Sequence, residues 1–270
     1  MKILKFKKQS KDKYKLYLDN NSDITLYEDV IIKNNLLITK EISDELLEAL
    51  KKQNNDMYAY TLALGYISVK MRSIKEINDY LIKKGFNNLV ANKVSERLIK
   101  EGYLNDLKYA KTFINDSMNL TNKGPQKIKM ELIKYGVNKD IIESEIALID
   151  QRKVEEKLNK LIDKELKIKK GSQNAIKIKI INHFVNLGYS KDLVTSILMS
   201  KEITSDKLKL KKDYAKLYNK YKVKYNGQEL LYFISQKLYS KGYTASDIKE
   251  VLKDREKTII ELRFGLNGDK

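Results

Sequence analysis

Apolar residues recur at helical spacing around four glycines. Gly85, Gly136, Gly188 and Gly242 lie 51, 52 and 54 residues apart. Apolar residues stand eight and four positions before each glycine, where they share one helix face, and again one and six positions after it. This pattern predicts a helix, a glycine stop and a second helix in every block. In chain order, the apolar residues are Ile77, Leu81, Phe86 and Ala91; Ile128, Leu132, Val137 and Ile142; Ile180, Phe184, Tyr189 and Val194; and Ile234, Leu238, Tyr243 and Ile248.

The glycines are predicted to end helices rather than to bind phosphate. Glycine accepts positive φ and therefore suits the left-handed cap at a helix C-terminus. A polar residue that can cap the next helix follows closely in each block, at Asn87 or Asn88, Asn138, Ser190 and Thr244. None of the glycines begins a GxGxxG or GxxxxGK pattern. The predicted structural caps are Gly85, Gly102, Gly136, Gly188 and Gly242.

A third helix is predicted before each pair. The dipeptides Tyr58-Ala59 and Tyr109-Ala110 lie 27 residues before a glycine, and Tyr214-Ala215 lies 28 before. In the third block, residues 154–169 fill this place as a charged, amphipathic helix. Ser73 to Glu76 forms a capping box, and Pro125 suits the first position of the matching helix. The predicted units are residues 55–103, 104–151, 152–203 (degenerate) and 204–254.

The N-terminal residues follow a different pattern. Alternation over residues 14–18 predicts a strand, residues 19–22 a turn, and residues 24–27 and 3–7 two further strands. Ser43 is expected to cap a short helix over residues 44–52. We therefore expect a β-containing cap over residues 1–54 and a loosely ordered tail over 255–270. The predicted fold is mainly α, an extended array of four tandem three-helix repeats behind this cap.

The composition agrees with a helical protein and limits the cellular locations that we expect for it. The chain has one Pro, eleven Gly and no Cys, which favours long helices and excludes disulfides and thiolate metal sites. We expect no signal peptide, because residues 1–5 lead into charge without an apolar stretch, and the sequence has no run of eighteen apolar residues. We expect a cytoplasmic monomer without a membrane span.

The positive charge is unevenly distributed. The net charge is +18, of which residues 1–56 contribute +1 and residues 57–270 contribute +17. Such an excess favours a polyanionic partner, usually nucleic acid. The alternative is compositional drift, because Lys, Asn and Ile are all abundant. Stacked repeats would align one set of basic residues into a stripe: Arg72, Lys75, Lys83, Lys84, Arg97, Lys100, Lys108, Lys111, Lys123, Lys127, Lys129 and Lys134.

The remaining side chains predict little chemistry. His183 is the only histidine and falls inside a predicted helix, so we expect neither a zinc site nor a nucleophilic triad. The acidic residues are interspersed with lysines, as expected of ion-paired helix faces. We predict no catalytic residue, metal or cofactor. Tyr103, Tyr109, Tyr189 and Tyr243 occupy repeat or cap positions, which predicts packing rather than base stacking.

Three segments, in order and at matching spacing, resemble the RecX family. The resemblance is clear over residues 57–150 and weaker over 151–254, and the N-terminal region resembles the β-containing leader of longer members. Asn105 stands where the family commonly has Asp, and Lys127 where it commonly has Arg. The segments are LIKEGYLNDLKYA (98–110); RSIKEI (72–77) with Leu81 and Lys84-Gly85-Phe86; and GPQKI (124–128) with Glu131-Leu132 and Gly136-Val137.

The resemblance implies tandem three-helix repeats and a non-enzymatic role in DNA repair and recombination. It implies binding in or along the groove of filaments of the RecA recombinase on single-stranded DNA, where the protein would inhibit ATP hydrolysis and strand exchange or promote filament disassembly. Direct binding to single-stranded DNA, and to double-stranded DNA as well, is implied too. The alternative is a sequence-independent nucleic-acid-binding repeat protein without a recombinase partner; it accounts for the charge but not for the three ordered segments.

Overall fold

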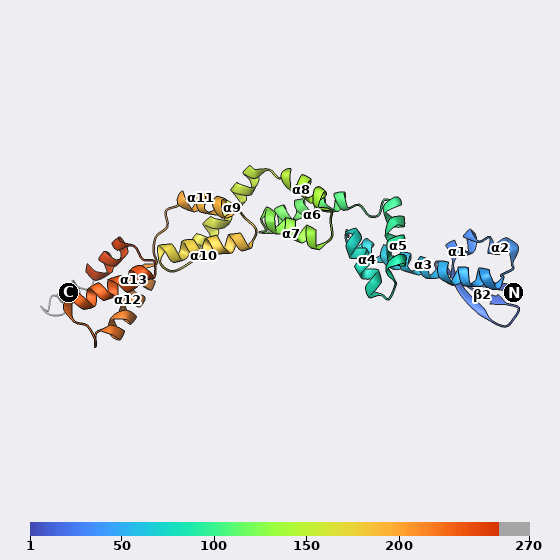
Figure 1. The fold of residues 1–270 in the computed structure, drawn as a ribbon, viewed down its shortest axis with the longest axis horizontal. Coiled ribbons are helices and arrows are strands. Elements are labelled where there is room, and N and C mark those ends of the chain that lie inside the picture. The colour runs from blue at the N-terminus through green and yellow to red at the C-terminus, as the bar shows by residue number, and fades with distance from the viewer. Residues whose placement is uncertain (254–270) are drawn as a thin grey trace, which may run out of the picture. The chain divides into compact units, whose positions relative to one another are not determined.

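A computed structural model describes residues 1–253 (Figure 1). The chain is mainly α, with a small antiparallel sheet at the N-terminus, as predicted. The strands are β1 (Ile3–Ser10), β2 (Lys13–Leu18) and β3 (Asp23–Tyr27). The helices up to the second glycine are α1 (Glu28–Lys33), α2 (Leu36–Thr39), α3 (Asp44–Val69), α4 (Ile74–Lys83), α5 (Asn88–Lys100), α6 (Asp106–Leu120) and α7 (Pro125–Lys134). They are followed by α8 (Lys139–Ala147), α9 (Gln151–Ile168), α10 (Gln173–Asn186), α11 (Lys191–Met199), α12 (Lys207–Tyr221), α13 (Gly227–Ser240) and a helical segment described over 245–253.

The N-terminal cap is a meander of order β1-β2-β3 covered by helices. Leu16 and Leu26, on neighbouring strands, are fully buried beside Leu36 of α2 and Leu50 of α3. The alternation over residues 14–18 follows from this, because only one sheet face meets the helices. The short helices α1 and α2 were not predicted. Their apolar residues form two groups, 30–32 and 36–38, each too short to show helical periodicity.

Helix α3 corrects one prediction. The short helix expected over residues 44–52 is instead the first part of a continuous helix, Asp44–Val69, that also supplies the first helix of the first repeat. The polar run at residues 53–55 resembles a linker, but Asn54 has a structural partner. Its side chain accepts a hydrogen bond from the Tyr27 N–H at 2.9 Å and donates one to the Thr25 carbonyl at 3.0 Å. The cap and the first repeat therefore share one helix.

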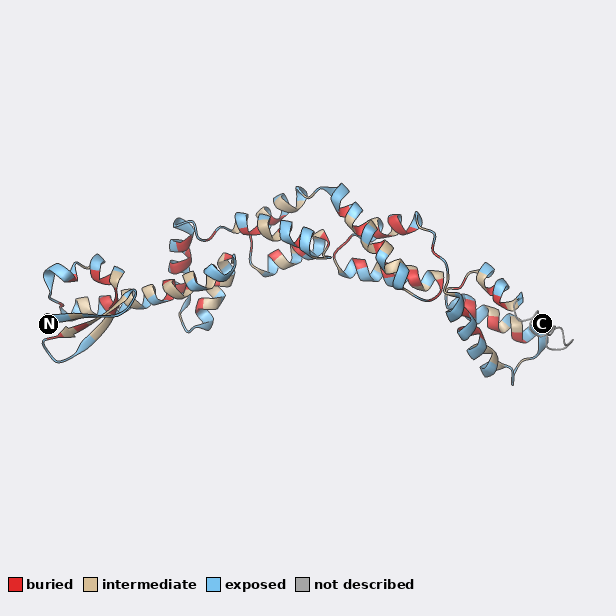
Figure 2. Ribbon diagram, turned by 180° about the vertical axis from the view of Figure 1, so that it is seen from behind, coloured by how far each residue is buried: buried red, intermediate tan, exposed pale blue. Residues whose placement is uncertain are grey.

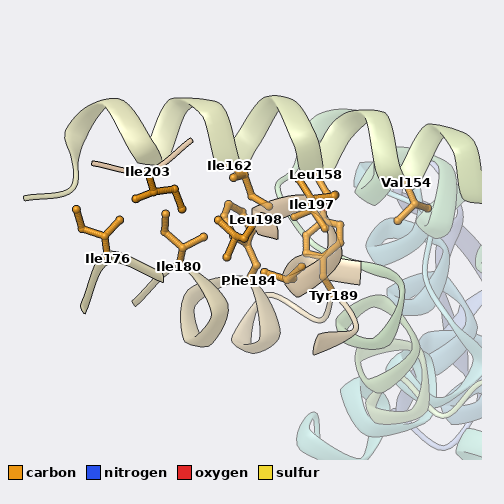
Figure 3. Packing of buried hydrophobic residues seen from close by; sticks show 11 residues of the cluster. Val154, Leu158, Ile162, Ile176, Ile180, Phe184, Tyr189, Ile197, Leu198 and Ile203 are labelled. Carbon is orange, nitrogen blue, oxygen red and sulfur yellow. The ribbon is translucent and has the colours of Figure 1, made fainter. Parts of the chain in front are cut away.

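The apolar positions flanking the glycines form the core of each repeat. The isoleucines eight residues before the glycines, Ile77, Ile128, Ile180 and Ile234, are all 0% exposed. Figure 2 shows buried residues interspersed with exposed ones along these helices. Figure 3 shows the third repeat, where Leu158 and Ile162 of α9 lie against Phe184 of α10. The degenerate third block thus keeps a complete core without the Tyr-Ala dipeptide.

The glycines lie at helix ends with positive φ. The values are +95° at Gly85, +80° at Gly102, +77° at Gly136, +91° at Gly188 and +86° at Gly242. At Gly85 the following residue returns to the helix just ended, because the Phe86 N–H donates to the Leu81 carbonyl at 3.1 Å. Side-chain caps then begin the next helix, and Ser73 and Glu76 form the expected capping box.

The same glycine ends also join successive repeats. We call α4, α7, α10 and α13 the middle helices. In three places, the carbonyl end of one middle helix meets the N-terminus of the middle helix of the preceding repeat, and we call each contact a joint. Ser73 Oγ donates to the Tyr135 carbonyl at 2.6 Å, and Ser172 Oγ donates to the Lys241 carbonyl at 2.6 Å. At the remaining joint, the Gly124 N–H donates to the Leu187 carbonyl at 2.7 Å.

The joints have a clear physical basis. A helix end leaves its last carbonyls without intrahelical partners, and a helix start leaves its first N–H groups free. Each joint satisfies a carbonyl at a helix end and brings the negative end of one helix dipole against the positive end of another. At two joints a helix-start N–H is satisfied as well, because the Gln126 and Asn174 N–H groups donate to the Gly188 and Gly242 carbonyls at 3.1 and 3.4 Å. It also requires close backbone approach: a Cβ at Gly136 would lie 2.6 Å from Cβ of Lys75. At Gly85, which has no preceding repeat, a Cβ would meet nothing within 4 Å.

The chain forms two compact units. Unit 1 comprises Met1–Asn115 and Glu131–Glu145; unit 2 comprises Asp116–Met130 and Ile146–Lys270. The joint at Gly136 lies in unit 1, and those at Gly188 and Gly242 lie in unit 2. The predicted boundaries at 54, 103, 151 and 203 remain predictions, and the predicted tail over 255–270 lies outside the described residues.

Candidate nucleic-acid and filament-binding surface

The basic residues chosen from the sequence differ in their exposure and partners. On α4 and just after it, Lys83 and Lys84 are exposed, and on α5 and α6 so are Lys100 and Lys108. Lys83 is the last residue of α4 and Lys84 its C-cap, whereas Ile77 and Leu81 of the same helix are buried in the core. Solvated ammonium groups of this kind can contact phosphates; that of Lys84 also lies 5.6 Å from the centroid of the Tyr80 ring.

Arg72 is used within the fold. Its side chain is only 11% exposed, its guanidinium stacks 3.7 Å from the centroid of the Tyr66 ring, and it pairs with Glu76 at 3.3 Å. Glu76 in turn belongs to the capping box of α4. Arg72 therefore fixes the approach to α4 and offers little surface to a phosphate. The spacing of residues in the sequence could not show that Arg72 is held by the fold, because Tyr66 contacts Arg72 across the turn between α3 and α4.

Arg97 belongs to a polar cluster with Tyr60 and Glu101. The guanidinium lies 3.8 Å from the Tyr60 ring centroid and donates to Glu101 at 2.7 Å. The Tyr60 hydroxyl donates to the same carboxylate at 2.5 Å. Burial and this hydrogen bond raise the pKa of Tyr60 to about 12, and the hydroxyl and guanidinium lower the pKa of Glu101. Both partners therefore favour ionised Glu101, and Arg97 already has an anionic partner.

Two lysines of unit 1 meet at a joint. Lys75 donates from Nζ to the backbone carbonyl of Lys134 at 3.2 Å, and its stem packs against Gly136. Both side chains are exposed. Lys111 pairs with Glu145 at 3.7 Å, so part of its charge is balanced locally. The joint thus places the Lys75 side chain against the backbone of Lys134, and the alignment of the basic side chains into one stripe stays a prediction.

The second repeat's remaining lysines belong to unit 2. Lys127 is exposed, but its backbone lies against Gly188 at the joint. Lys123 and Lys129 are only partly exposed, and the Lys123 carbonyl accepts the Tyr189 hydroxyl at 3.5 Å. That contact also buries Tyr189, whose pKa rises to about 12 because of burial.

The four tyrosines with predicted packing roles divide into two groups. Tyr109, Tyr189 and Tyr243 are buried, as expected. Tyr103 is 55% exposed, so its predicted packing role was wrong. Its backbone N–H closes the α5 cap on the Leu98 carbonyl at 2.9 Å, and Leu104 takes the buried place beside it.

The selection of the twelve stripe residues did not take the net charge of each repeat into account. Over the predicted boundaries, the four repeats carry net charges of +3, 0, +6 and +6. The stripe was placed on the first two repeats because the clearest motifs lie there. The charge excess is instead concentrated in the third and fourth repeats, where α12 alone carries six lysines among fifteen residues.

Other site types lack support in the part of the chain that the structure describes. Residues 1–253 contain no group of three or more His, Asp or Glu placed to hold a metal ion. Within the same residues, no helix combines the length and the apolar character needed to cross a bilayer. His183 is exposed on α10 and stacks edge-on against Phe184.

The fold and its lysine-rich exposed faces define a helical-repeat protein with a basic surface. Family profiles described as the first and the second three-helix domain of RecX match residues 59–98 and 105–144. The Regulatory protein RecX of Streptococcus uberis is 35% identical over 259 residues, which cover 94% of this chain and 99% of the relative. The chain therefore belongs to the RecX family.

Other relatives agree with this assignment. The Regulatory protein RecX of Staphylococcus haemolyticus is 26% identical and covers 93% of this chain and 96% of its own length. A crystal structure of a regulatory protein RecX matches with a TM-score of 0.65 at 22% identity, over 73% of this chain and 98% of that one, which supports the fold. The structure of RecX from Lactobacillus salivarius matches with a TM-score of 0.50 at 27% identity, over 54% of this chain.

Proposed function

We propose that this chain is a non-enzymatic regulator that binds filaments of RecA on single-stranded DNA and inhibits their ATP hydrolysis and strand exchange. Membership of the RecX family over nearly the whole chain is the observation that carries the proposal. Exposed lysines on helices of successive repeats supply a physical basis, because a filament presents phosphate and protein surface at regular intervals. Several weak contacts made by one chain gain strength from their linkage.

Within unit 1, the refined binding surface comprises Lys75, Lys83, Lys84, Lys100, Lys108 and Lys134, all exposed; Lys127, in unit 2, is an exposed candidate considered by itself. Arg72 and Arg97 leave this set because each already has a carboxylate partner and an aromatic ring. Lys111, Lys123 and Lys129 are weaker candidates, because Lys111 pairs with Glu145 and the other two are only partly exposed. Base recognition plays no part here, since lysines read charge rather than sequence.

Charge reversal tests this surface. The double variant Lys83→Glu and Lys100→Glu is expected to weaken binding to RecA filaments by roughly tenfold at moderate salt, and to reduce the salt dependence of binding. The measurement is fluorescence anisotropy of filaments on labelled single-stranded DNA. Reversal at Lys127 and Lys129 is expected to act in the same direction, although Lys127 also lies at a joint.

A matched control comes from the cap. Lys5 and Lys7 are exposed on β1, and residues 1–56 carry a net charge of only +1. The variant Lys5→Glu and Lys7→Glu changes the net charge by the same amount, and we expect nearly unchanged filament binding. Equal loss in both variants would show that total charge, rather than this surface, controls binding. Unchanged affinity of a folded Lys83/Lys100 variant would exclude the surface.

A further inference from the structure

The fourth repeat has an exposed groove that the proposed function does not use. It lies between α13 and the helical segment 245–253 and has a volume of about 600 Å³. Tyr232 and Tyr239 of α13 line it and are 68% and 67% exposed. Large aromatic side chains usually lie in a core, so two exposed rings in one groove favour a binding role.

The two rings are suitably spaced on one helix face. Positions seven residues apart return to the same side after two turns and lie about 10 Å apart along the axis. That distance corresponds to about three nucleotides at 3.4 Å each. Gln236 lies between them and donates to the Tyr232 hydroxyl at 3.3 Å, which holds one ring at the groove. A flat base can stack on a tyrosine ring whatever its sequence.

The opposite wall supplies positive charge. Lys249 and Lys253 line the groove from the segment 245–253, and both are exposed. Ile248 and Leu252 form its apolar floor. The surrounding repeat carries a net charge of +6. Ammonium groups beside exposed rings match a single strand, whose phosphates need cations and whose unpaired bases need aromatic faces.

We propose that this groove is a base-stacking site for single-stranded nucleic acid, in which Tyr232 and Tyr239 stack on bases and Lys249 and Lys253 contact phosphates. The site does not depend on a recombinase partner. Double-stranded DNA fits it less well, because its bases are already stacked and paired. An apolar peptide would use the floor and rings but would gain nothing from the lysines.

The test compares two oligonucleotides of equal length and charge, an oligothymidylate and an abasic strand. Wild-type protein is expected to bind oligothymidylate the more tightly in fluorescence anisotropy. The variant Tyr232→Ala with Tyr239→Ala should lose at least about tenfold affinity for oligothymidylate and little for the abasic strand. Lys249→Glu with Lys253→Glu should weaken binding to both strands.

Two controls keep the result interpretable. Tyr232→Phe with Tyr239→Phe retains both rings and should bind like wild type, which separates stacking from the hydroxyl groups. Tyr103→Ala removes an exposed tyrosine from the first repeat and should leave binding unchanged. The proposal fails if the alanine variant keeps its helix content and its oligothymidylate affinity. It also fails if affinity for both strands falls equally, or if wild type does not distinguish them.

Discussion

Replacing Phe184 with alanine is expected to destabilise the third repeat by about 3–5 kcal/mol, the usual cost of removing a buried phenyl ring. The ring is 1% exposed and lies edge-on to Tyr189, with centroids 6.0 Å apart. Leu158 and Ile162 approach it from α9 (Figure 3). The cavity cannot readily collapse, because Leu158 and Ile162 are held on a helix other than the one that carries Phe184.

The effect should be local. In a repeat protein each unit is stabilised mainly by itself and its neighbours, so a single global free energy of unfolding is a poor measure. Native-state hydrogen exchange resolves the repeats. In Phe184→Ala, we expect protection to fall in α9, α10 and α11 and to persist in α4. Val185→Ala, at a 39% exposed position of the same helix, is the control and should change protection little. If α9, α10 and α11 were equally protected in the wild type, in Phe184→Ala and in Val185→Ala, the assignment of Phe184 to the core would be contradicted.

Alanine at Gly188 is expected to cost about 2–5 kcal/mol, more than alanine at Gly85. Both residues have positive φ, +91° and +95°, so both substitutions carry a conformational cost of about 1–2 kcal/mol. At Gly188 the new Cβ would also overlap the backbone nitrogen of Lys127, which adds an overpacking cost of about 1–3 kcal/mol. At Gly85 the Cβ would meet nothing within 4 Å.

Hydrogen exchange at two amides reports this difference directly. The Gly124 and Gln126 N–H groups donate to the Leu187 and Gly188 carbonyls at 2.7 and 3.1 Å. In Gly188→Ala both amides should exchange faster, because the joint opens. In Gly85→Ala they should remain protected, although the end of α4 frays. If the two variants behaved alike at these amides, the glycine would serve only as a helix cap and the joint would carry no stability.

The parts of the fold that could be predicted are those specified by residues close together in the sequence. The capping box at Ser73, the proline at the start of α7 and the buried Ile and Leu positions act within one or two turns, so their spacing is visible in the sequence. The continuous helix α3 was missed because Asn54 and Asn55 have low helix propensity. Asn54 compensates through hydrogen bonds to β3, which lies far away in sequence.

The candidate surface was less predictable, because its selection depends on long-range contacts. Spacing placed Arg72 and Arg97 in the stripe, but Tyr66 and Tyr60 hold them against carboxylates. The joints were also invisible, since Gly124 and Gly188 meet only once both repeats have folded. Net charge per repeat was available from the sequence and would have directed attention to the fourth repeat and its exposed Tyr232.

The central functional claim is tested most directly by single-stranded-DNA-dependent ATP hydrolysis of the cognate RecA, titrated with this protein. Binding to naked DNA is recorded at the same salt concentration. We predict inhibition at protein concentrations too low to coat the free DNA, because the filament itself is the target. Unchanged hydrolysis, or loss of hydrolysis only once the DNA is coated, would contradict the account and favour a nucleic-acid-binding protein without a recombinase partner.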